Sequence, residues 1–191
     1  MSRLSEILEF NDRFVQGGAF EAYRTSKFPD KKLLVLSCMD TRLTELLPRA
    51  MNLKNGDAKI VKTAGAVISH PFGSIMRSLL VAIYELGVEE LMVVGHWGCG
   101  MASLDADRML QAMADRGITQ ETIVTLQGAG VDLHAWLQPV KSVEESVKAT
   151  VAMIRSHPLV PAHLPIEGLV MDPDTGKLDR VSFQSTEIAL D

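Results

Sequence analysis

Apolar runs of strand length alternate along this chain with longer segments in which apolar residues recur at helical spacing. The strand-sized runs are Leu33–Cys38, Ala58–Lys62, Leu91–Gly95 and Ile166–Met171. The helical segments are Phe72–Leu86, Ser103–Arg116 and Ser142–Ser156. Runs that are apolar on both faces suit parallel strands covered by helices. Strand and helix alternating in this way are typical of the α/β class, with a mostly parallel central sheet.

The two ends of the chain complete this arrangement. Ser2 can cap an N-terminal helix that Gly17-Gly18 interrupts, and its apolar residues are Leu4, Ile7, Leu8, Phe14 and Val15. A turn at Asp172–Gly176 precedes alternating residues over Leu178–Phe183, which predicts an antiparallel return strand. The length of 191 residues and the hydrophobic content of 47% fit one globular domain. We therefore predict a single α/β domain over residues 1–191, with helices flanking the sheet, an antiparallel C-terminal strand and an N-terminal helical arm at about 1–28.

Charge and hydropathy argue against several classes of partner. The chain has 19 Lys plus Arg against 24 Asp plus Glu, a net charge of −5, whereas phosphate binding needs a basic surface. No apolar run approaches the roughly 20 residues that span a bilayer, and the first residues lack the apolar stretch of a signal peptide. We therefore expect a cytoplasmic protein that binds neither nucleic acid nor membranes. There, metal binding or catalysis explains Cys38 and Cys99 better than a disulfide does.

Three residues with metal-binding side chains stand at the ends of predicted strands. Cys38 ends the first apolar run, His96 follows Leu91–Gly95, and Cys99 lies on the glycine-rich turn after it. If these strands are neighbours, the three side chains converge on one crevice. Two thiolates and an imidazole suit tetrahedral zinc, and three protein ligands leave one position open, as in catalytic sites. The alternative is that each cysteine is a small buried apolar residue.

The segment after Cys38 adds two charged side chains. In an extended segment, residues two and four positions further on share a face, so Asp40 and Arg42 are expected beside the metal. Arg42 could then hold Asp40 through a two-pronged ion pair. The alternative is an ordinary surface ion pair, which stabilises a fold very little. The methionines, by contrast, are interpreted as gap-filling core residues, namely Met76, Met92, Met101, Met109, Met113 and Met153.

Together these motifs resemble the β-class carbonic anhydrases. The main motif is Cys38-x-Asp40-x-Arg42 followed by His96-x-x-Cys99, in the same order as in that family. Two further segments are similar to family segments, Lys62–Ala66 and the strand–turn–strand at Gly168–Leu178. The chain departs from many members by having Thr41 in place of Ser and Lys62 in place of Arg. These departures leave the metal ligands intact and concern substrate preference and bicarbonate regulation.

The resemblance implies a zinc-dependent carbonic anhydrase, which hydrates carbon dioxide reversibly to bicarbonate and a proton by means of zinc-bound hydroxide. It makes Cys38, His96 and Cys99 the zinc ligands and gives Asp40 and Arg42 catalytic roles. It also makes Asp40 a conditional fourth ligand, because family members exist in a state where the matching aspartate binds zinc. His70 and His134 are candidate proton shuttles, although each is more simply explained as a surface or core histidine.

The resemblance also implies a homodimer or a dimer of dimers. The apolar face from Leu4 to Val15 and Trp136 are the candidate packing surfaces. Three alternatives stay open for the function. The same zinc site could hydrolyse carbonyl sulfide or carbon disulfide, or Asp40 could close it permanently in a non-catalytic zinc-binding module. The third is a metal-free enzyme that uses a Cys–His nucleophile.

Overall fold

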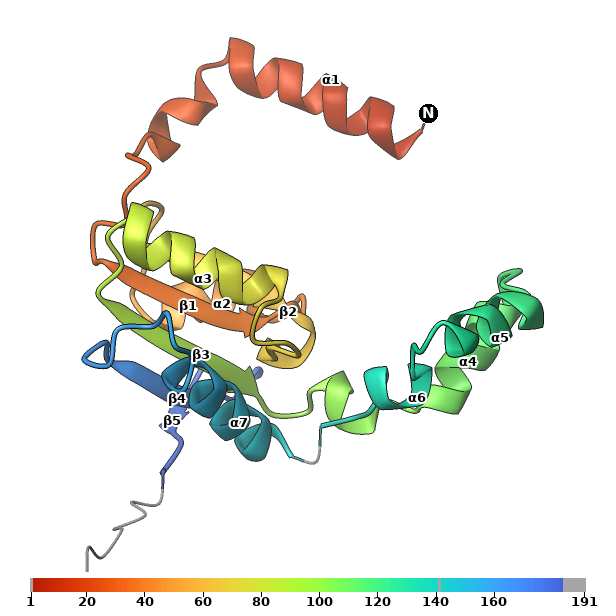
Figure 1. Cartoon of the computed structure of the whole chain (residues 1–191). Coiled ribbons are helices and arrows are strands. Elements are labelled where there is room, and N and C mark those ends of the chain that lie inside the picture. The colour runs from red at the N-terminus through yellow and green to blue at the C-terminus, as the bar shows by residue number, and fades with distance from the viewer. Residues whose placement is uncertain (1, 141, 184–191) are drawn as a thin grey trace, which may run out of the picture.

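The computed structural model describes residues 2–140 and 142–183; residues 1, 141 and 184–191 of the predicted domain lie outside them. Its strands form one sheet in the order β2-β1-β3-β4-β5 (Figure 1). The strands are β1 (Leu33–Cys38), β2 (Ala58–Thr63), β3 (Glu90–His96), β4 (Ile166–Met171) and β5 (Leu178–Arg180). The first four are parallel, and β5 runs antiparallel to β4. The predicted single α/β domain with its antiparallel C-terminal strand is confirmed.

The register of the strands brings their carboxyl ends to one edge of the sheet. Cys38 pairs with Thr63 of β2, Ser37 pairs with Val94 of β3, and His96 pairs with Met171 of β4. Every residue of β1 is buried, as expected for a strand covered on both faces. The side chains of Cys38, His96 and Cys99 can therefore converge as predicted, because β1 and β3 are direct neighbours.

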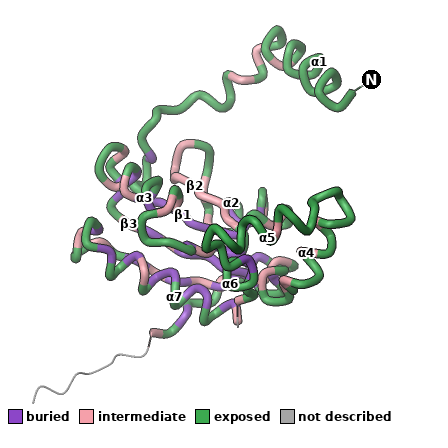
Figure 2. Tube along the Cα trace, turned by 45° about the vertical axis from the view of Figure 1, so that its right-hand side comes forward, coloured by how far each residue is buried: buried purple, intermediate pink, exposed green. Residues whose placement is uncertain are grey.

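Three helices pack their apolar residues against the sheet: α2 (Leu43–Ala50), α3 (Ser74–Glu85) and α7 (Val143–Arg155). Helix α7 lies especially close, since a Cβ added to Gly95 or Gly168 would stand 2.8 Å from a methyl carbon of Val147. The buried residues are concentrated in β1, β3, β4 and α7 (Figure 2).

Two helical segments stand away from this body (Figure 1). The first is the N-terminal arm, with α1 (Arg3–Gln16) and the 3-10 helix η1 (Ala19–Tyr23). The second, which we call the helical lobe, comprises residues 104–140 with α4 (Ala106–Asp115), α5 (Gln120–Gly128) and α6 (Leu133–Trp136). Helices α1, α4 and α5 contain no buried residue. None of the described helices is long and apolar enough to cross a membrane.

Several predicted boundaries were wrong. The segment Ser103–Arg116 is not one helix, because a 3-10 turn, η3 (Gly100–Ser103), comes first and Asp105 caps α4 by accepting a hydrogen bond from the Arg108 N–H. The return strand ends at Arg180, before the predicted Phe183. Helices α2, α5 and α6 were not predicted. Of the methionines interpreted as core, Met76 is fully buried, whereas Met109 is exposed on the helical lobe.

Candidate metal site

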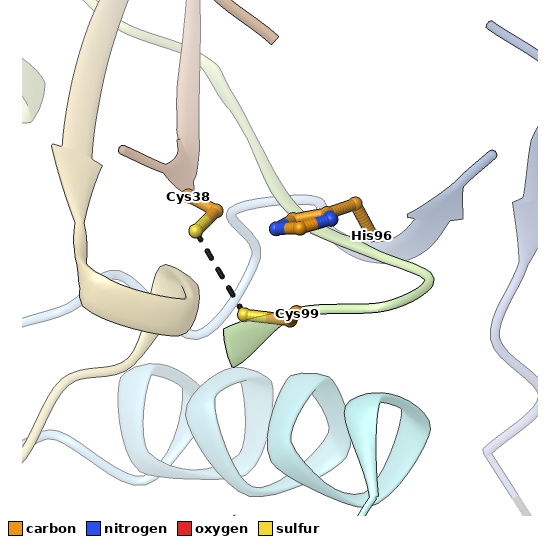
Figure 3. Close-up of side chains that lie close together, drawn as sticks. All are labelled: Cys38, His96 and Cys99. Atoms are coloured by element: carbon orange, nitrogen blue, oxygen red, sulfur yellow. Dashed lines mark hydrogen bonds between the residues drawn. The ribbon is translucent and has the colours of Figure 1, made fainter. Parts of the chain in front are cut away.

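Cys38, His96 and Cys99 meet at the carboxyl ends of β1 and β3, with their side chains pointing toward one another (Figure 3). The two sulfur atoms are 3.9 Å apart. One ligand atom from each of the three residues lies within 4.8 Å of the other two, and all three residues are buried. Cysteines and a histidine at this spacing can hold a metal ion.

His96 is oriented for metal binding by its other ring nitrogen. Its Nδ1 lies 2.9 Å from the carbonyl oxygen of Trp97, so Nδ1–H donates this hydrogen bond and Nε2 keeps its lone pair. Nε2 is buried and has no hydrogen-bond partner in the described chain. An unpaired buried nitrogen costs free energy unless something binds it. A metal ion between Nε2 and the two sulfur atoms fits this requirement.

Burial opposes a thiolate at Cys99 unless a cation accompanies it. Burial raises the pKa of the Cys99 thiol, and the neighbouring Cys38 raises it further. A backbone hydrogen bond from Met101 acts in the opposite direction on the same pKa. A bound metal ion reverses the effect of burial, because it stabilises the thiolate directly.

Asp40 lies beside this cluster and is held by Arg42. Asp40 Oδ1 accepts hydrogen bonds from the Arg42 backbone N–H at 2.9 Å and from Nε at 3.0 Å, and Oδ2 accepts one from Nη2 at 2.9 Å. Asp40 Oδ2 is also 3.7 Å from His96 Nε2. The Arg42 hydrogen bonds hold the pKa of Asp40 well below its usual range. The carboxylate therefore stays ionised next to the metal-binding atoms.

The backbone conformation that brings Asp40 and Arg42 together differs from the predicted one. The prediction placed residues 38–42 in an extended segment, but the chain turns after Met39 and Arg42 already has helical backbone angles. Asp40 and Arg42 meet because the aspartate carboxylate accepts the N–H two residues on, as in an Asx turn. The proximity was predicted correctly, but for the wrong local structure.

A cavity of ≈ 360 Å³ opens onto the cluster. Its polar contributors include Cys38, Asp40, Thr41 and Cys99. The other lining residues are Met39, Ala64, Gly65, Gly100, Met101 and Leu104. The cavity is thus largely apolar around a small set of reactive groups, as is usual for sites that bind small molecules.

The two candidate shuttle histidines do not line this cavity. His70 is exposed, and its Nδ1 accepts a hydrogen bond from the Phe72 N–H. His134 lies on the helical lobe, where its Nδ1 is 3.7 Å from an oxygen of Asp107. Sequence reasoning missed Gly65 as a wall of the site; Met101, predicted as a gap-filling core residue, packs against the core and also lines the cavity. The paired glycine and methionine come from distant segments, so no local pattern signals their contact.

Comparisons with known proteins agree with this geometry. A sequence profile described as carbonic anhydrase matches residues 33–178. YtiB of Bacillus subtilis (strain 168), whose carbonic anhydrase name is provisional, is 56% identical over 181 residues, which cover 95% of this chain and 97% of that protein. A carbon disulfide hydrolase of Acidithiobacillus thiooxidans is 30% identical over 166 residues, which cover 83% of this chain and 81% of that protein.

Among solved structures, β-carbonic anhydrase isoform I (TvaCA1) of Trichomonas vaginalis superposes with a TM-score of 0.86 and 36% identity. The match covers 95% of this chain and 98% of that one. Because the profile covers most of the chain and this structural match is nearly complete, the chain belongs to the β-carbonic anhydrase family.

Proposed function

We propose that this protein is a zinc-dependent carbonic anhydrase that converts carbon dioxide and water reversibly to bicarbonate and a proton. One observation carries the proposal: the unpaired Nε2 of His96 faces the sulfur atoms of Cys38 and Cys99, beside an ionised Asp40. This donor set suits zinc, since thiolates and imidazole are its usual ligands. Cys38, His96 and Cys99 would hold the zinc, and Asp40 and the cavity lie beside these three residues.

Zinc at this site would supply a Lewis acid that makes bound water acidic near neutral pH. The protein's own contribution is positioning. Asp40, ionised and fixed by Arg42, accepts a hydrogen bond from the reacting water and orients its lone pair. The apolar walls at Met39, Met101 and Leu104 leave room for a small neutral molecule and limit competing water.

Asp40 has a second role in this proposal, as a conditional fourth ligand. Its Oδ2 is hydrogen-bonded to Arg42 and also lies 3.7 Å from His96 Nε2. If the hydrogen bonds to Arg42 broke, the Asp40 carboxylate could turn toward a bound metal ion. The Asp40–Arg42 pair would therefore control whether Asp40 or water occupies the fourth coordination position.

Carbon disulfide or carbonyl sulfide hydrolysis is the second candidate. Two observations favour it: the similarity to a carbon disulfide hydrolase, and a cavity wall that includes two methionines, Met39 and Met101. Thioether sulfur is polarizable and packs well against other soft atoms. Both candidates use the same zinc site, so the substrates have to be compared directly.

We also propose that the chain assembles as a homodimer or a dimer of dimers. The arm, at about residues 1–28, carries the exposed apolar residues Leu4, Ile7 and Leu8, and the helical lobe exposes Trp136. Apolar surface of this extent is rarely left open to water in a monomer. A second copy of the chain is the partner we propose.

Elemental analysis combined with stopped-flow hydration of carbon dioxide tests the function. We expect about one zinc per chain and turnover, with carbon disulfide and carbonyl sulfide assayed in parallel. Asp40→Asn should keep zinc and lose most turnover, because an amide is a poor acceptor for this hydrogen bond. Bound zinc without turnover of carbon dioxide, carbon disulfide or carbonyl sulfide indicates a non-catalytic zinc-binding module. A metal-free chain with one readily alkylated thiolate indicates a Cys–His nucleophile instead.

A further inference from the structure

Met101 lies on the cavity wall, in a turn held by main-chain hydrogen bonds. It belongs to η3, two residues after Cys99. Its carbonyl accepts a hydrogen bond from the Val140 N–H at 3.0 Å, and the next residue, Ala102, donates its N–H to the Cys99 carbonyl at 3.0 Å. This turn thus connects a candidate metal ligand to the end of the helical lobe.

The side chain of Met101 packs against Gly65, which lines the same cavity from a different loop. Gly65 belongs to η2 (Ala64–Ala66), at the end of β2, and has φ +73°. A Cβ added to Gly65 would lie 2.9 Å from Met101 Cγ and 3.1 Å from Met101 Cβ. Only glycine lets Met101 lie this close. The contact therefore joins the loops after β2 and β3 at the wall of the site.

We propose that Met101 is a positioning residue for Cys99: its side chain, packed against Gly65, fixes the η3 turn and thereby the position of the Cys99 sulfur. The inference rests on the proposed zinc-dependent function, because it concerns how this sulfur is presented to the metal. Contacts of this kind, one shell outside the ligands, typically change metal affinity by about 10- to 100-fold.

The proposal differs from a merely structural role in what it expects. If Met101 only fills space, shortening it lowers the free energy of unfolding and leaves the Cys99–metal bond as it was. If Met101 positions Cys99, shortening it frees the η3 backbone and the Cys99 sulfur loses its fixed position. The metal then binds more weakly, and the electronic transitions of the sulfur–metal bond change.

The test uses full-length protein loaded with cobalt(II), because cobalt has thiolate-to-metal charge-transfer absorption where zinc is silent. We compare Met101→Ala with Gly65→Ala, whose added methyl group would clash with the Met101 side chain and displace it. Met101→Leu is the conservative variant and should restore the wild-type values, since leucine and methionine exchange with little disturbance. Gly87→Ala controls for the backbone: Gly87 has φ +70°, and an added Cβ there meets nothing within 4 Å.

We expect Met101→Ala and Gly65→Ala to lower cobalt and zinc retention against a chelator by about 10-fold or more, with a shifted charge-transfer band. Met101→Leu and Gly87→Ala should match the wild type. Wild-type retention and absorption in Gly65→Ala would overturn the proposal, even where Met101→Ala does not fold. An equal loss in Gly87→Ala would overturn it too. Turnover is measured separately: a wild type that binds metal and hydrates nothing refutes the proposed function, and the Met101 result still stands.

Discussion

At the scale of single residues, the Asp40–Arg42 pair differs from the ion pairs on the helix surfaces. Arg49 and Glu45 of α2 are 78% and 80% exposed and meet at 3.3 Å, so their pair adds little stability. Asp40 is only 21% exposed and accepts three hydrogen bonds from Arg42. Because Arg42 lowers the pKa of Asp40, the stabilisation from this pair is complete above the ordinary pKa of 3.8 and is lost as pH falls below it.

Removing Arg42 should therefore change the pH dependence of the reaction. In Arg42→Ala the Asp40 carboxylate is free to occupy the fourth metal position, and a rising hydroxide concentration is needed to displace it. We expect the rise in kcat/KM with pH to move to higher pH or to disappear, while zinc stays bound. Arg49→Ala, which breaks the exposed Arg49–Glu45 pair of α2, is the control and should keep the wild-type profile. A pH–rate profile for each variant decides this, and an unchanged profile in Arg42→Ala would leave the pair without a catalytic role.

The three-residue cluster makes a separate prediction about metal content. Cys99→Ser replaces a thiolate with a hydroxyl that binds zinc poorly, and His96 Nε2 and Cys38 alone do not make a tight site. We expect the variant to lose both zinc and activity while circular dichroism shows an intact fold. Elemental analysis of the purified protein checks it. Full zinc occupancy in Cys99→Ser would remove Cys99 from the ligand set.

At the scale of elements, the position of α7 depends on two glycines in the strands beneath it. A Cβ at Gly168 would lie 2.8 Å from Val147 Cγ1 and 3.0 Å from Phe183 Cζ. The sheet and α7 are therefore packed with no space for one further methyl group. This close approach matters for the site, because α7 covers β3 and β4, whose ends carry and support His96.

Gly168→Ala should accordingly lower the free energy of unfolding by about 1–3 kcal/mol, the usual cost of an extra carbon in a packed core. The cause is steric, since Gly168 does not have the positive φ that favours glycine. Gly128→Ala is the matched control, because an added Cβ at the end of α5 meets nothing within 4 Å. Urea denaturation of both variants measures the difference. Equal stability of Gly168→Ala and wild type would contradict the close packing.

The strands and helices that were predicted from the sequence have apolar residues in short continuous runs or at helical spacing. The runs that form β1, β3 and β4 are short, apolar and bounded by turn residues, so their burial could be read directly. Helix α2 was missed because it is short and contains Pro48, which normally argues against helix. Helix α5 was missed because its apolar residues do not gather on one side, and none of them is buried.

The site divides in the same way. Cys38, His96 and Cys99 could be predicted because strand ends meet at one edge of a parallel sheet, whatever the details of the loops. The Asp40–Arg42 contact was predicted through an extended segment that the chain does not form. The Met101–Gly65 contact could not be predicted, because it depends on a positive φ at Gly65 and on two loops that only the folded sheet brings together.

At the scale of the whole molecule, the body is compactly packed, whereas α1 of the arm and α4 and α5 of the helical lobe contain no buried residue (Figure 2). The lobe begins next to Leu104 and ends at Val140, which bonds to Met101, so both of its ends lie at the cavity wall. The arm is joined to the body near its end, where Asn55 Nδ2 donates a hydrogen bond to the Tyr23 carbonyl at 2.7 Å and Lys59 Nζ donates one to the Lys27 carbonyl at 2.6 Å. Its apolar residues contact one another, as Phe14 does with Phe10 and Tyr23. Both segments therefore present surfaces that a second copy of the chain could cover.

This arrangement predicts that a single charge on the apolar side of α1 weakens assembly. Leu8 is 55% exposed within one chain. Burying a leucine contributes roughly 1.5–3 kcal/mol, so Leu8→Asp should raise the Kd of the assembly by about tenfold or more. Asn11→Asp adds the same charge at another exposed position of the helix and should leave the assembly intact. Light scattering over a range of protein concentrations measures both. A wild-type chain that stays at its monomer mass of 20.9 kDa at every concentration would mean that the arm is not an assembly surface.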